Sequence, residues 1–468
     1  MSKSIYADVN SDETRVAIVK DGKLLDLDIR RVEENKSVGN IYLGIVTNVV
    51  AGINSCFVDI GKGKNVFLPI SDYQGDIRKG ESVMIQVNKE EIHDKGAKVT
   101  GKISLPGRSI VFMPTEPKIG VSKNIKDVET RKILKEILSS VAPKGTGFVA
   151  RTNAEKKSKK MIIREAKFLI KKWDTVHKNY KKALKNKKPC MIYEESDLVT
   201  YAAREYLDES TVVFFVNDKT AYKKVIGYVN NVLPEFKGRV VYYESDVPLF
   251  EKHKLEIQIE NLKKRTINLD CGGYIILEQT EALTAIDVNT GSFTKGLNRE
   301  STAMKVNEEA AFVSAQQILL RDIGGIIIID FIDLDMRKNR ERLFNILKNE
   351  MSDDKAKTTI YPMTRLGLIE MTRQRRKESI VKIICSDCPY CGGSGMIFSG
   401  TTMYIKIKRE LLLKGPGMPG KFINLFLHPR VAEVFDEKGT SGIEKVLKKK
   451  IKLRRDYKLH HEEFKITA

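Results

Sequence analysis

One short run, Ile326–Ile332, constrains the fold of this chain more than any other segment. It is almost wholly apolar and β-branched, which predicts a strand buried inside a sheet. The run also contains Asp330. Upstream, the segments Gly273–Glu278 and Ala282–Val288 have the pattern of a hairpin, and Asp287 lies in the second of them. The sequence therefore predicts a sheet that carries two aspartates on strands separated by a long helix.

The two aspartates are candidates for a metal site. Adjacent strands would bring the carboxylates of Asp287 and Asp330 within a few ångströms, and ionised carboxylates in apolar surroundings take a cation or change pKa. Mg²⁺ suits them, because it is usually held by one or two carboxylates together with water and phosphate oxygens. Asn289 shares the strand face of Asp287 and could orient a ligand. The alternative is a helix cap, or an ion pair with Arg321 or Arg337.

The charge of the chain bears on its partner. The formal net charge is +21 and the sequence pI is about 9.4. Such a surplus attracts nucleic acid or an acidic membrane face, although it can also serve solubility alone. No apolar run approaches the ~18 residues that span a bilayer, and the N-terminus lacks the apolar core of a secretory signal. We therefore expect a cytoplasmic protein of several compact units.

The positions of the histidines indicate what kind of hydrolysis the aspartates could support. The chain has six histidines, and none lies between residues 254 and 427. Cleavage of a phosphodiester near neutral pH without a metal usually needs imidazole as general acid and base. A metal ion that lowers the pKa of water needs no histidine. The pattern therefore favours metal-assisted hydrolysis.

Three of the six cysteines form a cluster, Cys385, Cys388 and Cys391. Cys388-Pro-Tyr-Cys391 followed by glycines is typical of a zinc knuckle, and a structural zinc needs four ligands. Either Cys385 and a remote residue complete the site, or a second copy of the chain does. The alternative is a redox pair or thiols without metal. The scattered cysteines are predicted to be buried apolar residues: Cys56, Cys190 and Cys271.

The rest of the chain divides into regions of different pattern. Residues 1–35 read as a small set of strands, and five strand-like runs within 36–117 predict a small closed barrel. An amphipathic helix is expected over Ile162–Leu184, with lysines on its polar face. Residues 211–245 read as strand–helix–strand, and a short α/β segment follows residue 398.

Two aromatic residues in the barrel, Phe57 and Phe67, could face a ligand. By themselves they are more typical of a core. Elsewhere, Arg151 and Thr152 follow an apolar strand and Arg373 follows another. A guanidinium fork with a hydroxyl suits a phosphate dianion. The alternative is that the arginines pair with acidic neighbours such as Glu155 or Glu370.

Five motifs, in order along the chain, resemble those of the bacterial ribonuclease E/G family. They are ARTNA at Ala150–Ala154, TEALTAIDVNTG at Thr280–Gly291, LRDIGGIIIIDFID at Leu320–Asp333, RLGLIEMTRQR at Arg365–Arg375 and CPYCGGSG at Cys388–Gly395. The resemblance covers essentially the whole chain. Because the chain lacks the long tail of E-type members, we expect a G-type member that does not scaffold a multi-enzyme assembly.

The resemblance implies a multidomain α+β fold. Its parts would be an RNase H-like fold in two pieces, an inserted S1-type OB barrel, a 5′-sensor, a DNase I-like catalytic domain, a zinc link and a small C-terminal α/β domain. The expected bounds are 1–35 and 200–262 for the RNase H-like fold, 36–117 for the S1-type barrel and 118–199 for the 5′-sensor. The catalytic domain would be 263–384, the zinc link 385–397 and the small domain 398–468. In this family the RNase H-like part carries no catalysis.

The resemblance also implies an activity. We expect a single-strand-specific endoribonuclease that hydrolyses RNA with Mg²⁺, leaves 5′-phosphate and 3′-hydroxyl ends, and is stimulated by a 5′-monophosphate. Its substrates would be ribosomal RNA precursors and mRNA, in rRNA processing and mRNA decay. The alternative is a non-catalytic RNA-binding or ribosome-associated factor, against which the intact Asp287, Asn289 and Asp330 argue.

Several residue roles follow from the same resemblance. Asp287 and Asp330 would bind Mg²⁺ with Asn289 in support, and Phe57 and Phe67 would contact RNA, which reverses the preference for a core. Arg151, Thr152 and Arg373 would bind the 5′-monophosphate.

The resemblance finally implies an assembly. Cys388 and Cys391 of each of two protomers would share one Zn²⁺, in a homodimer or a tetramer of two such dimers. The additional Cys385 departs from the family pattern, which leaves the ligand set open.

Overall fold

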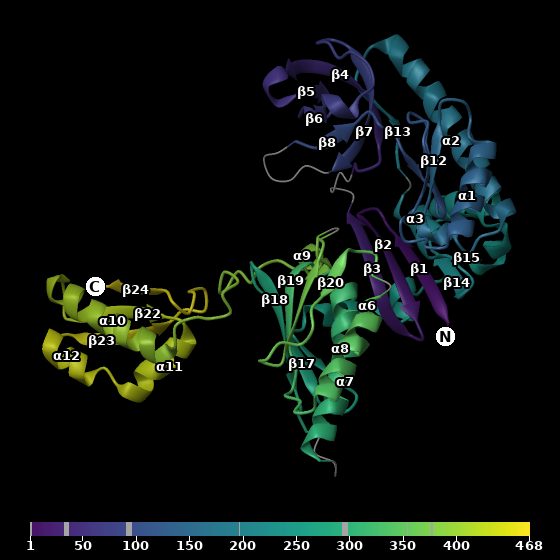
Figure 1. The fold of residues 1–468 in the computed structure, drawn as a ribbon. Helices are drawn as coiled ribbons and strands as arrows, with labels where there is room; N and C mark the ends of the chain where they lie inside the picture. The colour runs from purple at the N-terminus through teal and green to yellow at the C-terminus, as the bar shows by residue number, and fades with distance from the viewer. Residues whose placement is uncertain are drawn as a thin grey trace. The chain divides into compact units, whose positions relative to one another are not determined.

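The computed structural model describes residues 2–31, 37–89, 96–195, 197–292, 298–352, 354–375 and 378–468. The chain separates into two units, Met1–Ile383 and Ile384–Ala468 (Figure 1). Helices and strands are mixed in both units, which confirms the multidomain α+β class. Among the described residues, no helix combines the length and apolar character needed to cross a bilayer.

A five-stranded sheet joins the start of the chain to a segment far along the sequence. Strands β1 (Lys3–Val9), β2 (Glu13–Lys20) and β3 (Lys23–Arg31) form an antiparallel meander. Strand β1 also pairs in parallel with β14 (Thr211–Val216), which pairs with β15 (Val240–Tyr242). The predicted strands and the predicted strand–helix–strand unit are both confirmed. The helices here are α3 (Leu198–Tyr206), α4 (Lys219–Val232), α5 (Leu249–Lys252) and α6 (Leu255–Glu260).

Five short strands close into an OB-like barrel, as predicted. They are β4 (Ile41–Val50), β5 (Ser55–Asp59), β6 (Val66–Pro69), β7 (Ser82–Lys89) and β8 (Lys98–Thr100). The order is β4-β5-β6-β8-β7, and a β4–β7 pairing closes the ring. The chain leaves the barrel after β8, and Leu105 begins a strand of another sheet.

That second sheet has the order β11-β12-β10-β9 and packs against two helices. Its elements are β9 (Leu105–Pro106), β10 (Ile110–Met113), β11 (Ile119–Val121), α1 (Val128–Val141), β12 (Gly147–Ala150) and α2 (Lys159–Asn186), after which β13 (Cys190–Tyr193) returns to the barrel strand β4. The side chain of Ser158 caps α2 by accepting a hydrogen bond from the backbone N–H of Met161. The buried face of α2 includes Ile162, Ala166 and Leu169, which confirms the predicted amphipathic helix.

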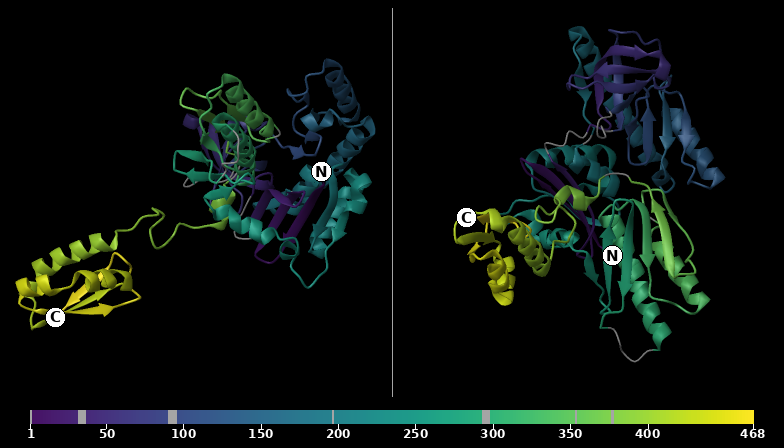
Figure 2. Two further views of the ribbon diagram at one scale, coloured as in Figure 1. Left: turned by 90° about the horizontal axis from the view of Figure 1, so that it is seen from below. Right: turned by 90° about the vertical axis from the view of Figure 1, so that its left-hand side faces the viewer.

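A six-stranded sheet carries both aspartates, in the order β16-β17-β18-β19-β21-β20. Its strands are β16 (Thr266–Asn268), β17 (Tyr274–Gln279), β18 (Leu283–Asn289), β19 (Gly325–Asp330), β20 (Thr358–Ile360) and β21 (Leu368–Arg373), and the helices are α7 (Arg299–Leu320), α8 (Arg337–Glu350) and α9 (Ile380–Ile384). Figures 1 and 2 show α7 and α8 side by side along this sheet. Their apolar side chains form one core with the buried face of the strands.

Strand β19 is buried on one face only, which corrects the expectation of a fully buried strand. Ile327 and Ile329 are 0% exposed under the helices, whereas Ile326 is 50% exposed and Ile328 is half-buried. The reason is that, among the described residues, α7 and α8 cover just one face of the sheet. The other face, called here the open face, is exposed at Asp330.

The second unit contains a three-stranded sheet in the order β23-β22-β24. Its elements are α10 (Gly400–Lys414), β22 (Phe422–Leu427), α11 (Pro429–Lys438), α12 (Ser441–Leu447), β23 (Lys450–Arg455) and β24 (Phe464–Thr467). Met403, Ile407 and Phe435 lie in its core with the strands. The predicted short α/β segment is confirmed, while the predicted domain bounds along the chain stay predictions.

Candidate active site

The register of two parallel strands brings the predicted aspartates together. Asp287 on β18 is the direct partner of Asp330 on β19. Neighbouring strands lie about 4.8 Å apart, and both side chains project from the open face. Helix α7 makes this possible, because a parallel pair of strands needs a crossover connection between them. The sequence placed both residues on strands, and the pairing makes them neighbours.

The side-chain amide of Asn289 and the shifted pKa of Asp330 both support a metal site at these two aspartates. The side-chain N–H of Asn289 donates to Oδ2 of Asp287 at 2.8 Å, which limits the rotation of that carboxylate. The pKa of Asp330 is raised, first by partial burial and then by the nearby charges of Asp287 and Asp333. Crowded carboxylates are relieved by a cation or a proton. The site can therefore hold a hard cation, and Asp333 is an additional acidic neighbour to which the sequence pattern assigns no role.

Neither arginine considered as an ion-pair partner reaches these aspartates. Arg337 pairs with Glu341 at 2.8 Å, and Arg321 donates to the side chain of Gln317 and to a backbone oxygen of Lys264. In the described part of the chain, no group of three or more His, Cys, Asp or Glu side chains is arranged to hold one metal ion. Mg²⁺ needs only one or two carboxylates, so the donor set fits Mg²⁺ better than a metal held by protein ligands alone.

The two barrel aromatics form a pair outside the barrel core. Phe57 and Phe67 are register partners on β5 and β6, with ring centroids 6.2 Å apart in an edge-to-face arrangement. Both are half-buried, whereas the residues that alternate with them, such as Val58 and Leu68, are 0% exposed. The pleat therefore directs the phenylalanines away from the interior. This placement favours a binding surface over the core alternative.

Arg151 lies at the end of β12 with its guanidinium already paired. Its two terminal nitrogens donate to the carboxylate of Glu205 at 3.0 and 3.2 Å, and one also donates to the backbone oxygen of Gly107. The hydroxyl of Thr152 bonds that of Ser122 at 3.1 Å. Burial raises the pKa of Glu205, but its hydrogen bond with Arg151 and nearby cations lower it overall. The acidic partner is thus Glu205 and not Glu155, and sequence separation hides this pairing from any motif.

Arg373, the other arginine predicted to bind the 5′-monophosphate, is buried and already paired with carboxylates, and its predicted role stays a prediction. It is 5% exposed on the buried face of β21. Its guanidinium donates to Asp354 at 2.8 and 3.1 Å and also to Asp322. Burial alone would lower the pKa of Arg373, but these carboxylates raise it. The ion-pair alternative fits Arg373, with Asp354 and Asp322 in place of the expected Glu370.

The cysteine cluster offers two neighbouring thiols. The backbone N–H of Gly395 donates to Sγ of Cys391 at 3.3 Å, and this bond is the main reason why the pKa of Cys391 is lowered. A side-chain interaction with Cys388 acts in the same direction. Two thiolates fill half of a zinc site. Of the scattered cysteines, only Cys56 is buried as predicted, since Cys190 is exposed and Cys271 is half-buried.

Comparison with known proteins gives these positions a context. The sequence profile of the ribonuclease E/G family matches residues 104–376. The chain belongs to the ribonuclease E/G family. Ribonuclease G of Haemophilus influenzae is 33% identical, with 99% of each chain covered, and ribonuclease G of Escherichia coli K12 is 31% identical, with 100% of each covered. Ribonuclease E of Haemophilus influenzae is 35% identical over 88% of this chain but 46% of its own length.

The family assignment confirms the resemblance read from the motifs, and the full-length match agrees with a G-type member. Asp287, Asn289 and Asp330 lie within the segment that the ribonuclease E/G profile matches, and so do Arg151 and Thr152. The barrel aromatics and the cysteine cluster lie outside that segment.

Proposed function

We propose that this protein cuts single-stranded RNA internally by Mg²⁺-assisted hydrolysis, with Asp287 and Asp330 as the metal ligands. That it is a hydrolytic endoribonuclease follows from its membership of the ribonuclease E/G family and its full-length similarity to proteins named ribonuclease G. The observation that supports the metal site best is the register pairing of Asp287 with Asp330 on the open face, with Asn289 bonded to Asp287.

The residues of the site would have different roles in cleavage. Asp287 and Asp330 would hold the ion, and Asn289 keeps the Asp287 carboxylate in one orientation. When bound, Mg²⁺ would polarise the attacked phosphate and lower the pKa of water. Water, and not the neighbouring 2′-hydroxyl, would attack the phosphorus, and the 3′-oxygen would be the leaving group, so that the products would carry 5′-phosphate and 3′-hydroxyl ends. The open face leaves room for an RNA strand to approach these side chains.

RNA binding is proposed to use the barrel and the positive charge of the chain. Phe57 and Phe67 present ring surface on which unpaired bases can stack, and such stacking tolerates any sequence. The net charge of +21 attracts the phosphate backbone. Unpaired RNA is favoured because only splayed bases can reach the rings. Ribosomal RNA precursors and mRNA are the proposed substrates, and they would place the protein in the cytoplasm.

Recognition of a 5′-monophosphate is proposed for Arg151 and Thr152. The guanidinium of Arg151 is held by Glu205, and its side chain is 35% exposed. A phosphate would therefore contact a pre-positioned arginine next to a hydroxyl donor. Arg373 is left out of this proposal, because a phosphate would first have to displace Asp354 and Asp322.

The domain plan is proposed as the motifs imply it. The pairing of β1 with β14 supports one RNase H-like sheet made of 1–35 and 200–262. The OB-like ring within 36–117 supports the S1-type barrel, although β9 and β10 of that range pair toward β12 in the proposed 5′-sensor, 118–199. The DNase I-like domain would be 263–384, followed by the zinc link, 385–397, and the small domain, 398–468.

The zinc link is proposed to join two copies of the chain. Cys388 and Cys391 lie close enough to interact, and no third metal-ligating side chain accompanies them among the described residues. Two such pairs complete a tetrahedral Zn²⁺ site.

One experiment tests the central proposal. A 5′-monophosphorylated A/U-rich oligoribonucleotide is incubated with the protein in Mg²⁺ or in EDTA, and the product ends are identified. Internal cleavage with 5′-phosphate ends only in Mg²⁺ is expected. Binding without cleavage would favour the alternative, a non-catalytic RNA-binding factor.

A further inference from the structure

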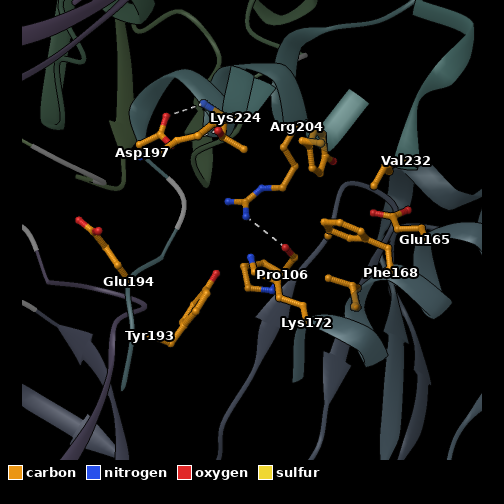
Figure 3. A pocket seen from close by; sticks show the side chains of 14 residues that line it. Pro106, Glu165, Phe168, Lys172, Tyr193, Glu194, Asp197, Arg204, Lys224 and Val232 are labelled. Carbon is orange, nitrogen blue, oxygen red and sulfur yellow. Dashed lines mark hydrogen bonds and ion pairs between the residues drawn. The ribbon is translucent and has the colours of Figure 1, made fainter. Parts of the chain in front are cut away.

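A cavity of about 280 Å³ lies away from the aspartates, where α2, α3 and α4 meet the turn at Pro106 and Gly107 (Figure 3). Its volume is just below the range of about 300–1,000 Å³ that is typical of small-molecule sites. The wall contains apolar and aromatic side chains, among them Phe168, Leu169 and Tyr193, together with several charged groups. Figure 3 shows the guanidinium of Arg204 projecting between Tyr193 and Phe168.

One polar group in the wall has no partner. Tyr228 is 9% exposed, and its phenol oxygen is buried without a hydrogen-bond partner among the described residues. Its ring packs edge-to-face on Phe168 at 5.8 Å between centroids, so the ring itself is held in place. A buried polar atom without a partner costs about 1–3 kcal/mol. The position of Tyr228 in the cavity wall suggests that its hydroxyl donates a hydrogen bond to a ligand or water atom.

Most charges of the wall are already neutralised in pairs. Arg204 pairs with Glu195 at 2.7 Å, and Asp197 pairs with Lys224 at 3.7 Å. Glu165 accepts hydrogen bonds from backbone N–H groups at Arg108 and Ser109. These groups therefore do not call for a further counter-ion.

Among the cations of the wall that the structure describes, Lys172 is the exception. Its ammonium lies 4.7 Å from the centre of the Tyr193 ring, and no carboxylate pairs with it in the described part of the chain. Burial lowers the pKa of Lys172, although the nearby negative charge of Glu195 acts in the opposite direction. An anion bound in the cavity would supply the missing charge partner. The ammonium over the Tyr193 ring also marks one end of the space as cationic and aromatic.

We propose that this cavity binds a small organic anion with a planar ring, of about the size of a mononucleotide. Its anionic group contacts Lys172, an acceptor atom receives the hydrogen bond of Tyr228, and its ring lies against Phe168 and Tyr193. No such site is needed for cleavage at Asp287 and Asp330.

The cavity is connected to Arg151 through one side chain. Arg204 donates to Glu205 at 3.3 Å, and Glu205 holds the guanidinium of Arg151. Arg204 also donates to the backbone oxygen of Pro106, next to Gly107, which accepts from Arg151. A bound anion that draws Arg204 toward itself weakens the Arg204–Glu205 contact. This consequence rests on the proposed recognition of a 5′-phosphate by Arg151, whereas the binding itself does not.

Calorimetric titration of the full chain with AMP, UMP, adenosine and inorganic phosphate tests the binding. Saturable binding of AMP or UMP is expected, with adenosine and phosphate each at least tenfold weaker, because each keeps only half of the contacts. Lys172→Met should weaken nucleotide binding about tenfold, and Tyr228→Phe about three- to tenfold, the effect of one hydrogen bond. Lys171→Met is the matched control, since Lys171 is the exposed neighbour on the same helix, and it should bind like the wild type.

Two outcomes would overturn the proposal. One is the absence of saturable binding for both nucleotides at millimolar concentration. The other is binding that survives Lys172→Met and Tyr228→Phe but is lost in Thr152→Val, which would place the nucleotide at the candidate 5′-phosphate site. Tyr228→Phe removes a single oxygen, and thermal unfolding of each variant separates lost binding from lost folding. Nucleotide binding that leaves the 5′-monophosphate preference unchanged would remove only the connection to Arg151.

Discussion

Asp287 on β18 and Asp330 on β19 are register partners in a parallel pair of strands, and both point out of the open face of their sheet. The pairing places two carboxylates side by side with a third, Asp333, close enough to raise the pKa of Asp330. Such crowding persists in a fold only if it has a use or is tolerated at the surface. A bound cation is the use that the chemistry favours.

Replacing either aspartate should abolish most RNA cleavage but leave RNA binding nearly unchanged. Asp287→Asn or Asp330→Asn should lower cleavage by orders of magnitude while RNA affinity stays near wild type, because an amide lacks the charge that holds Mg²⁺. Glu370→Gln is the matched control, since Glu370 lies on the same face beside Ile328. Cleavage rates, dissociation constants and product ends are measured. Cyclic 2′,3′-phosphate ends, or full activity in EDTA, would contradict the mechanism.

The raised pKa of Asp330 predicts a pH dependence of activity and of stability. The carboxylate must be ionised to hold a cation, so at subsaturating Mg²⁺, where protons compete with the metal, activity should fall on acidification at a pH above the ordinary aspartate value of about 3.9. Without metal, the folded state favours the protonated form of Asp330, so the ionised carboxylate of Asp330 destabilises the folded state at neutral pH. Asp330→Asn should therefore unfold at the same or a higher temperature than the wild type at pH 7. The difference should vanish below the unfolded-state pKa, and a lower melting temperature at pH 7 would count against it.

The barrel aromatics should contribute to affinity more than to stability. A stacking side chain is worth ~1–3 kcal/mol per base, so Phe57→Ala should weaken RNA binding roughly ten- to a hundredfold at ~1.4 kcal/mol per factor of ten. Phe57→Leu keeps apolar bulk without a ring and should lose most of the same affinity. Filter binding and thermal unfolding are compared. If RNA affinity falls only in proportion to the loss of folding stability, Phe57 is a core residue and not an RNA contact.

Arg373 and Arg151 should behave differently when replaced. Arg373→Leu leaves Asp354 and Asp322 buried without their cation, which typically costs roughly 3–5 kcal/mol. The variant should be less stable and should cleave 5′-monophosphate and 5′-hydroxyl RNA with equally reduced rates.

Thr152→Val, at the proposed phosphate site, should instead remove most of the rate advantage of 5′-monophosphate RNA and leave the 5′-hydroxyl substrate near wild type. Rates on both substrates are compared for the two variants. A selective loss in Arg373→Leu would restore that arginine to the phosphate site.

The cysteine pair predicts a stoichiometry. If two chains share one ion, zinc content should be near one per two chains, and Cys391→Ser should yield monomers with reduced activity. Cys385→Ser is the control and should keep zinc and assembly. Metal analysis and light scattering measure both. One zinc per chain, with Cys385 required, would indicate a site closed within one protomer.

The sequence alone determined the local structure and the residues that bear the chemistry. Periodic apolar patterns were sufficient for β1–β3, for the barrel strands and for α2, because backbone geometry imposes those periods on any half-buried element. The long motifs containing Asp287 and Asp330 were sufficient for the family. They also placed both aspartates on strands.

Tertiary structure alone decided which charges meet and which faces are covered. The run containing Ile326 looks the same in sequence whether helices cover one face of its strand or both, and the packing of α7 and α8 left Ile326 half exposed. Arg373 pairs with Asp322 and Asp354, and both of these partners lie far from it in sequence. A guanidinium carries the same charge in either setting. Whether it meets a phosphate or a buried carboxylate therefore depends on strand pairing and burial, which no local pattern encodes.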